Sequence, residues 1–153
     1  MSNHPSIEEL FQRIVEVVIA DFSDIVVDVQ LRYTPSGAVE RLRIFLVDET
    51  FLDIWLSLSG KYSYHWEQRH VRGCIHRHDN APHKKWREVK TFPKHFHDGK
   101  EDNVKESTIP DEPTAATSYF LSFVRDSLSK KPILDKNSIQ DTVKSIREDR
   151  DSK

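Results

Sequence analysis

The sequence predicts an α+β fold, a five-stranded antiparallel meander with an N-terminal and a C-terminal helix packed on one face. A long His-rich loop is expected after the last strand. Apolar residues recur at helical spacing near both ends of the chain, and between these ends they alternate with polar residues in five short stretches. Because the intervening turns are too short for parallel crossovers, neighbouring strands are predicted to be antiparallel.

The two helices have clear start signals. Ser6 and Glu9 form a capping box, and helical spacing then predicts a helix from Ile7 to about Ala20. A second helix is expected to start at residues 111–113, where two acids and a proline favour a first helical turn. Its core-facing stripe comprises Ala116, Tyr119, Phe120, Phe123 and Val124.

Five strands are expected between these helices, at residues 25–33, 41–46, 52–58, 62–67 and 74–78. The turns between them hold typical turn residues, as in Thr34-Pro35-Ser36-Gly37. Trp55 alternates away from the apolar face of the third strand. We therefore expect Trp55 to lie under a helix or in a dimer contact, which leaves a homodimer open.

Length and composition predict a single α+β domain at residues 1–130, followed by a charged tail at 131–153 that is a marginal helix or disordered. No apolar run is long enough to cross a membrane, and no charged-then-apolar segment indicates secretion. The single cysteine, Cys74, excludes an internal disulfide. These features favour a cytoplasmic protein, and no cofactor is expected.

Charge is distributed unevenly along the chain. Residues 1–60 hold four basic and ten acidic side chains, whereas residues 61–100 hold ten basic and four acidic side chains. The basic segment also contains Trp66 and Trp86. Phosphate groups attract Lys and Arg, and aromatic rings stack on unpaired bases. The segment is therefore a candidate site for a polyanion such as RNA.

Seven of the eight histidines lie in the same segment, between His65 and His97. Imidazole transfers protons near neutral pH, so one interpretation is metal-independent RNA cleavage. We expect the general base and general acid among His83, His95 and His97. Arg77 or Lys94 would then stabilise the charge on phosphorus, and Asp79 would orient a histidine.

Imidazole is also the commonest protein metal ligand, so a metal-dependent hydrolase is the alternative. His76 and His78 are expected to share one face of a strand, and His95 and His97 repeat the spacing. These four histidines are the candidate ligands, with Asp79 and Asp98 nearby. A non-enzymatic module that binds a partner is a further alternative.

A compound motif in this region resembles the TumE-like family, and a looser similarity extends over residues 5–128. The motif comprises Tyr64-His65, Arg77-x-Asp79-Asn80-x-Pro82-His83, Thr91-Phe92-Pro93-x-His95-x-His97-Asp98-Gly99, Glu101-Asp102-Asn103-Val104 and Ser107. Two segments depart from the family pattern: a longer turn at residues 69–73, which includes His70, and the basic insertion Lys84-Lys85-Trp86-Arg87.

The resemblance implies the toxin component of a toxin–antitoxin pair, with RNA as its target and a small helix-turn-helix antitoxin as its partner. The sequence thus predicts an RNA-cleaving or RNA-binding protein; an enzyme of this kind would be a ribonuclease. The expected catalytic residues are His83, His95, His97, Arg77, Asp79 and His65. The expected substrate-binding residues are Lys94, Lys84, Lys85, Arg87 and Trp86.

Overall fold

The structure is a computed structural model that describes residues 4–130. Its helices are α1 (Ile7–Asp21), α2 (Arg69–Arg72) and α3 (Pro113–Lys130), with a short 3-10 helix, η1 (Lys84–Trp86). Its strands are β1 (Val26–Tyr33), β2 (Val39–Leu46), β3 (Phe51–Leu56), β4 (Tyr62–Glu67), β5 (Ile75–Asp79), β6 (His95–Gly99) and β7 (Val104–Glu106).

The chain divides into two units, residues 1–122 and 123–153. The first unit contains α1, the whole sheet and the beginning of α3. The described part of the second unit continues α3 to Lys130. The domain boundary expected at residue 130 stays a prediction, and the charged tail lies outside the described residues.

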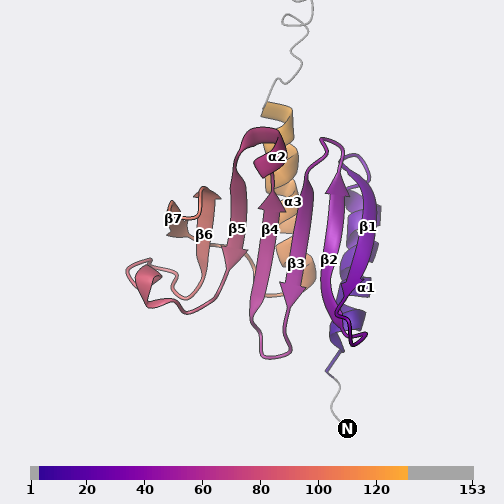
Figure 1. Cartoon of the computed structure of the whole chain (residues 1–153), viewed down its shortest axis with the longest axis horizontal. Coiled ribbons are helices and arrows are strands. Elements are labelled where there is room, and N and C mark those ends of the chain that lie inside the picture. The colour runs from indigo at the N-terminus through magenta and orange to yellow at the C-terminus, as the bar shows by residue number, and fades with distance from the viewer. Residues whose placement is uncertain (1–3, 131–153) are drawn as a thin grey trace, which may run out of the picture. The chain divides into compact units, whose positions relative to one another are not determined.

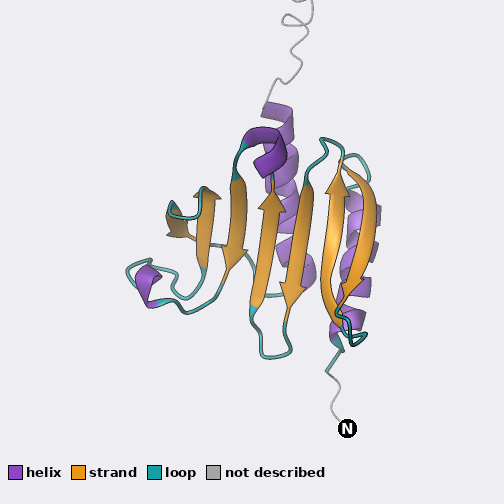
Figure 2. Cartoon of the chain, viewed as in Figure 1, coloured by secondary structure: helices purple, strands orange, loops and turns teal. Residues whose placement is uncertain are grey.

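The sheet of the first unit is an antiparallel meander in which all strands follow their sequence order (Figures 1 and 2). The predicted α+β class and antiparallel pairing are confirmed, but the sheet has seven strands instead of five. The expectation of a long loop was wrong in part, because two stretches of that segment form β6 and β7. β6 has a single large apolar residue, Phe96, and β7 has only three residues, so neither gives a clear apolar alternation.

The predicted capping of α1 is confirmed, since the Ser6 hydroxyl accepts a hydrogen bond from the backbone N–H of Glu9 at 3.1 Å. α1 and the beginning of α3 cover one face of the sheet (Figure 1). The core between these layers consists of large apolar side chains. It includes Phe11, Ile14, Val18, Leu42, Ile44, Leu52, Ile54, Tyr64, Trp66 and Phe120.

On β2 and β3 the face covered by the helices carries aliphatic side chains, whereas on β5 it carries the imidazoles of His76 and His78. His76 lies next to Trp66, with ring centroids 5.5 Å apart, and His78 stacks on Phe96 at 4.3 Å. The Nδ1 atom of His78 also forms a 2.7 Å hydrogen bond with the Ser107 hydroxyl. These two histidines therefore belong to the core side of the sheet.

The opposite face of the sheet is covered by neither α1 nor the beginning of α3 (Figure 1). Trp55 shares this face with Ser63 and Asp79 and is 41% exposed, so the helix alternative for Trp55 was wrong, whereas the dimer contact stays a prediction. Among residues 4–130, no helix is long and apolar enough to cross a membrane.

We predict that the burial of His78 makes the folded chain less stable in acid. Burial, together with the nearby His76, lowers the pKa of His78 to about 3, whereas an unfolded histidine titrates near 6.5. The unfolded chain therefore binds an extra proton between these values, and stability falls as pH decreases below 6.5. We expect His78 to account for a loss of about 3 kcal/mol in unfolding free energy between pH 7 and pH 4.

Urea denaturation at several pH values measures this contribution. The His78→Phe variant should show a correspondingly weaker dependence of its unfolding free energy on pH in this window. Equal pH dependence in both proteins would show that folded His78 accepts a proton readily.

Candidate functional site

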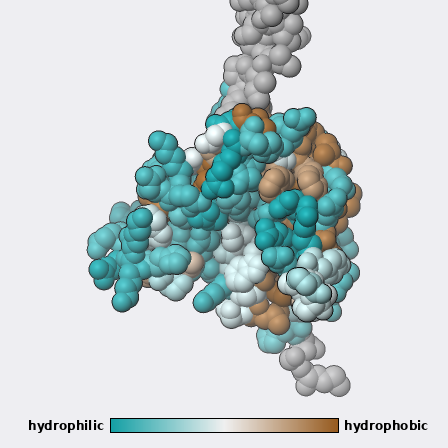
Figure 3. All heavy atoms as spheres, in the orientation of Figure 1, coloured by the Kyte–Doolittle hydropathy of each residue, from teal (hydrophilic) through white to brown (hydrophobic). Residues whose placement is uncertain are grey.

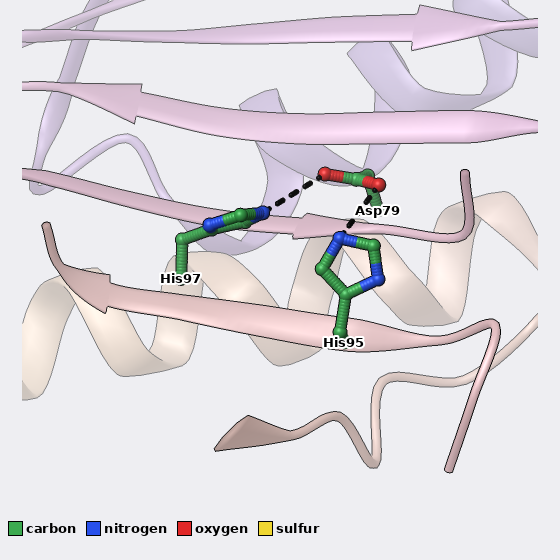
Figure 4. Close-up of side chains that lie close together, drawn as sticks. All are labelled: Asp79, His95 and His97. Atoms are coloured by element: carbon green, nitrogen blue, oxygen red, sulfur yellow. Dashed lines mark ion pairs between the residues drawn. The ribbon is translucent and has the colours of Figure 1, made fainter. Parts of the chain in front are cut away.

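A compact cluster of Asp79, His95 and His97 lies on the face of the sheet opposite α1 and the beginning of α3 (Figure 4). The Nε2 atom of His95 is 3.0 Å from Asp79 Oδ1, and the Nε2 atom of His97 is 3.4 Å from Asp79 Oδ2. Both imidazoles are less than 5% exposed, and the carboxylate side chain is 11% exposed. Two buried rings therefore converge on one carboxylate.

Strand register creates this cluster. Asp79 on β5 pairs with His95 on β6, and Arg77 pairs with His97. Residues two apart on a strand share a face, so all four side chains point away from the helices. The same rows continue across β4, where Ser63 pairs with Asp79 and His65 pairs with Arg77.

Two backbone carbonyl groups fix the orientation of the rings. His95 Nδ1 lies 2.8 Å from the carbonyl oxygen of Pro93, and His97 Nδ1 lies 2.8 Å from that of Glu101. A carbonyl oxygen only accepts hydrogen bonds, so each Nδ1 must donate a proton. Each Nε2 therefore faces Asp79.

The Asp79 carboxylate is held in its charged form. Burial raises the pKa of Asp79, but His95, His97 and the backbone N–H of Ala81 stabilise the anion and lower the pKa far below its usual range. Arg77 Nε also donates to Asp79 Oδ2 at 3.0 Å. Asp79 is thus a fixed negative charge under the two rings.

The charge on Asp79 acts in turn on His95. Burial lowers the pKa of the His95 imidazole, but the Asp79 carboxylate and the Pro93 carbonyl stabilise its protonated form and raise the pKa above the ordinary value. An imidazolium at this position retains its proton at a higher pH than an exposed histidine does. His95 is therefore suited to donate a proton or to stabilise negative charge.

The cluster forms part of the wall of a hollow of about 520 Å³. Hydrophilic side chains predominate over β5–β7 and η1 on this side of the molecule (Figure 3). Aromatic rings, cations and acids all line the hollow. The lining comprises Trp55, Tyr62, Ser63, Arg77, Asp79, Ala81, His83, Lys85, Trp86, His95, His97, Glu101 and Asp102.

η1 places an aromatic ring against the cluster. The Trp86 ring lies edge-on to His97, with centroids 5.8 Å apart, and is tilted against His95 at 6.2 Å. The Lys85 ammonium lies 4.9 Å from the centre of the Trp86 ring. The basic insertion noted in the sequence therefore reaches the cluster through these two residues, whereas Lys84 and Arg87 are exposed and lie outside the hollow.

Arg77 is paired with two carboxylates, those of Asp79 and Glu101. Its guanidinium donates two hydrogen bonds to the Glu101 carboxylate, at 2.8 and 2.6 Å, besides the bond to Asp79. Glu101 was not among the predicted site residues. It belongs to the motif quoted above, but no periodicity indicated that the turn after β6 would bring it back to Arg77.

Two other predicted residues lie outside the hollow. His65 lies next to Arg77, with 3.4 Å between His65 Nδ1 and Arg77 Nη1. Burial, and the charge of Arg77, lower the pKa of His65. The Lys94 ammonium instead donates to the Ile109 carbonyl at 2.5 Å and pairs with Asp111 at 3.1 Å. Lys94 therefore anchors the loop before α3.

The four histidines considered as metal ligands do not come together. Strand alternation puts His76 and His78 on the helix-covered face, and His95 and His97 on the other. The structure instead offers Asp79, His95 and His97, whose candidate ligand atoms all lie within 4.8 Å of one another. All three residues are candidates in the sequence, but spacing groups His95 and His97 with His76 and His78, because only the pairing of β5 with β6 shows which side chains share a face.

Comparison with known proteins identifies the family. The family model described as toxin TumE matches residues 15–128. The chain belongs to the TumE toxin family. The match spans the sheet and all of the cluster described above. No curated protein and no solved structure matched the chain.

Membership of the TumE family confirms the resemblance inferred from the motif. The chain is therefore a toxin component of a toxin–antitoxin system, and its family implies an antitoxin partner.

Replacing Asp79 tests the electrostatics of the cluster. The Asp79→Asn variant should have a lower His95 pKa, because the amide no longer stabilises the imidazolium. Titration of the imidazole ¹⁵N resonances in EDTA-treated protein measures this change. Asp98→Asn is the matched control, since Asp98 lies 3.4 Å from His76 on the other face of the sheet. An unchanged His95 pKa in Asp79→Asn would contradict the assignment.

Proposed function

We propose that this toxin acts on RNA and cleaves its phosphodiester backbone at the hollow beside Asp79, His95 and His97. The convergence of two tethered imidazoles on one carboxylate, in a hollow with cationic and aromatic walls, carries the proposal. Proton transfer needs paired groups of this kind, and RNA binding favours cations and aromatic rings. The basic character of residues 61–100 agrees with a polyanionic substrate.

Side chains around the hollow fit the parts of an RNA strand. Exposed Lys85, with Lys84 and Arg87 on the same segment, is suited to phosphate contacts. Trp55, 41% exposed on the same wall, offers a surface on which a base can stack. Glu101 is 51% exposed, so a phosphate can exchange with it at the guanidinium of Arg77.

The proposed reaction is transfer of the phosphoryl group to the neighbouring 2′-oxygen. His97 Nε2 takes the proton of the 2′-hydroxyl, and the 2′-oxygen forms a bond to phosphorus as the bond from phosphorus to the 5′-oxygen breaks. His95 Nε2 gives its proton to the departing 5′-oxygen. The products are a 2′,3′-cyclic phosphate and a 5′-hydroxyl end. The raised pKa of His95 supports its role as the acid.

We further propose that the partner of this toxin is a small helix-turn-helix antitoxin, in line with the family resemblance of the sequence motif described above. An RNA target and such an antitoxin would both be met in the cytoplasm. We therefore propose that the toxin acts there and is restrained by binding to the antitoxin.

RNA cleavage by purified protein tests the proposed reaction. The His95→Ala and His97→Ala variants should each cleave RNA at least about 100-fold more slowly than the unmodified chain, because general acid–base catalysis contributes factors of this size. His70→Ala is the control, since His70 binds the Glu49 carbonyl in an exposed turn away from the hollow. Cleavage is measured with EDTA and, separately, with added Zn²⁺ or Mn²⁺.

End-group analysis of the products checks the chemistry. A 2′,3′-cyclic phosphate is expected on every 3′ end that cleavage creates. Intact RNA under all conditions, or equal cleavage by the His95, His97 and His70 variants, would overturn the proposal. RNA binding without cleavage would favour a non-enzymatic binding module.

Substitution of two neighbouring lysines distinguishes RNA binding at the hollow from general attraction between charges. Lys85→Ala should weaken RNA binding. The negative slope of log affinity against log salt concentration should become less steep by about 0.7, as expected for one lost phosphate contact on a single strand. Lys84→Ala removes the same charge one residue away but outside the hollow, so its effect should be smaller. Fluorescence anisotropy at several salt concentrations measures both, and equal effects would contradict a specific role for Lys85.

A further inference from the structure

We infer that Asp79, His95 and His97 form a binding site for a divalent transition-metal ion. The inference goes beyond the proposed action on RNA, because metal binding is a property of the folded chain alone. It rests on the hydrogen bonding of the two rings, the distances between the three side chains and their burial.

Hydrogen bonds to the backbone fix the protons on the two rings. His95 and His97 each donate from Nδ1 to a backbone carbonyl oxygen at 2.8 Å. In a neutral imidazole with Nδ1 protonated, Nε2 carries a lone pair. Both rings are therefore held in the tautomer that binds a metal through Nε2. Metal-ligating histidines commonly have such a hydrogen bond from the other ring nitrogen.

The space between the two rings and the Asp79 carboxylate is suited to a cation. When both rings are neutral, their two Nε2 lone pairs face a carboxylate oxygen and repel it, and either a proton on a ring or a metal ion removes this repulsion. His95 is 0% exposed, and its Nε2 has no aligned hydrogen-bond partner among residues 4–130, although it lies 3.0 Å from Asp79 Oδ1. A metal ion would satisfy this orphaned nitrogen and the other two groups together.

The separations between ligand atoms agree with coordination. Bonds of about 2.1 Å to a common ion put two ligand atoms about 3.0 Å apart at a right angle and about 3.4 Å apart at a tetrahedral angle. His95 Nε2 lies 3.0 Å from Oδ1 of Asp79 and His97 Nε2 lies 3.4 Å from Oδ2, so these distances fit an ion that both carboxylate oxygens bind. All three candidate ligand atoms lie within 4.8 Å of one another.

The donor set selects the class of metal. Two imidazole nitrogens with one carboxylate suit first-row transition ions such as Zn²⁺, Mn²⁺ or Fe²⁺, whereas Mg²⁺ and Ca²⁺ prefer oxygen ligands. Arg77 donates to the same carboxylate, but Glu101 compensates its charge through two hydrogen bonds. Three protein ligands beside a hollow leave coordination positions for water or substrate.

Metal binding to the unmodified chain and to matched variants tests the inference. Protein stripped with EDTA is titrated with Zn²⁺ in a calorimeter and with Co²⁺ in a spectrophotometer. We expect one ion per chain and visible Co²⁺ absorption bands. Asp79→Asn and His97→Ala should each bind at least about 100-fold more weakly. His70→Ala and Asp98→Asn, which change a histidine and a carboxylate elsewhere, should bind like the unmodified chain.

Imidazole ¹⁵N resonances of the unmodified chain give a readout that needs no variant. Zn²⁺ should shift the Nε2 resonances of His95 and His97, while both Nδ1 atoms stay protonated. Absence of a stoichiometric ion, equal affinity in the cluster and control variants, or Zn²⁺ shifts confined to other histidines would each overturn the inference.

These measurements contain no RNA, so they are independent of the proposed function. RNA cleavage in EDTA by a chain that also binds Zn²⁺ would support both proposals and show that the ion is not required for cleavage. Stoichiometric Zn²⁺ binding without RNA cleavage would support the metal site and overturn the ribonuclease proposal.

Discussion

The site of this toxin depends on two hydrogen bonds to backbone carbonyl groups. The carbonyls of Pro93 and Glu101 each accept a proton from Nδ1 of a histidine, and this turns both Nε2 atoms toward Asp79. Because the rings are buried, they cannot reorient freely toward water. The backbone around β6 therefore determines which nitrogen atom of each ring faces the carboxylate.

The sheet supplies this arrangement through its two different faces. On the side covered by α1 and the beginning of α3, aliphatic and aromatic side chains form the core, and His76 and His78 extend that core onto β5. On the other side, β5 and β6 present polar groups that would be costly in a hydrophobic core. One strand pair thus contributes both to stability and to the candidate site.

Much of the fold could be predicted from the sequence, because its signals are local. The capping box at Ser6, the helical spacing after it and the alternation in the first five strands all depend on near neighbours. β6 and β7 could not be recognised in this way. On β6 the imidazoles of His95 and His97 take the positions facing the hollow, so its alternation is between histidine and a single phenylalanine.

Part of the site could also be predicted from the sequence. The compound motif included His95, His97, Arg77 and Asp79, all of which lie in or beside the cluster. The roles of Lys94 and Glu101 depend on contacts with distant segments, Ile109 in one case and Arg77 in the other. Likewise, the separation of His76 and His78 from His95 and His97 follows from strand pairing rather than spacing.

The central claim is that Nδ1 of both rings is protonated and that both Nε2 atoms face Asp79. Neutron diffraction from deuterated crystals of EDTA-treated protein would locate these protons directly. The account predicts a deuteron on Nδ1 of His95 and His97, each directed at its backbone carbonyl, with both Nε2 atoms turned toward the carboxylate. A ring with bare Nδ1, or one turned away from Asp79, would contradict it.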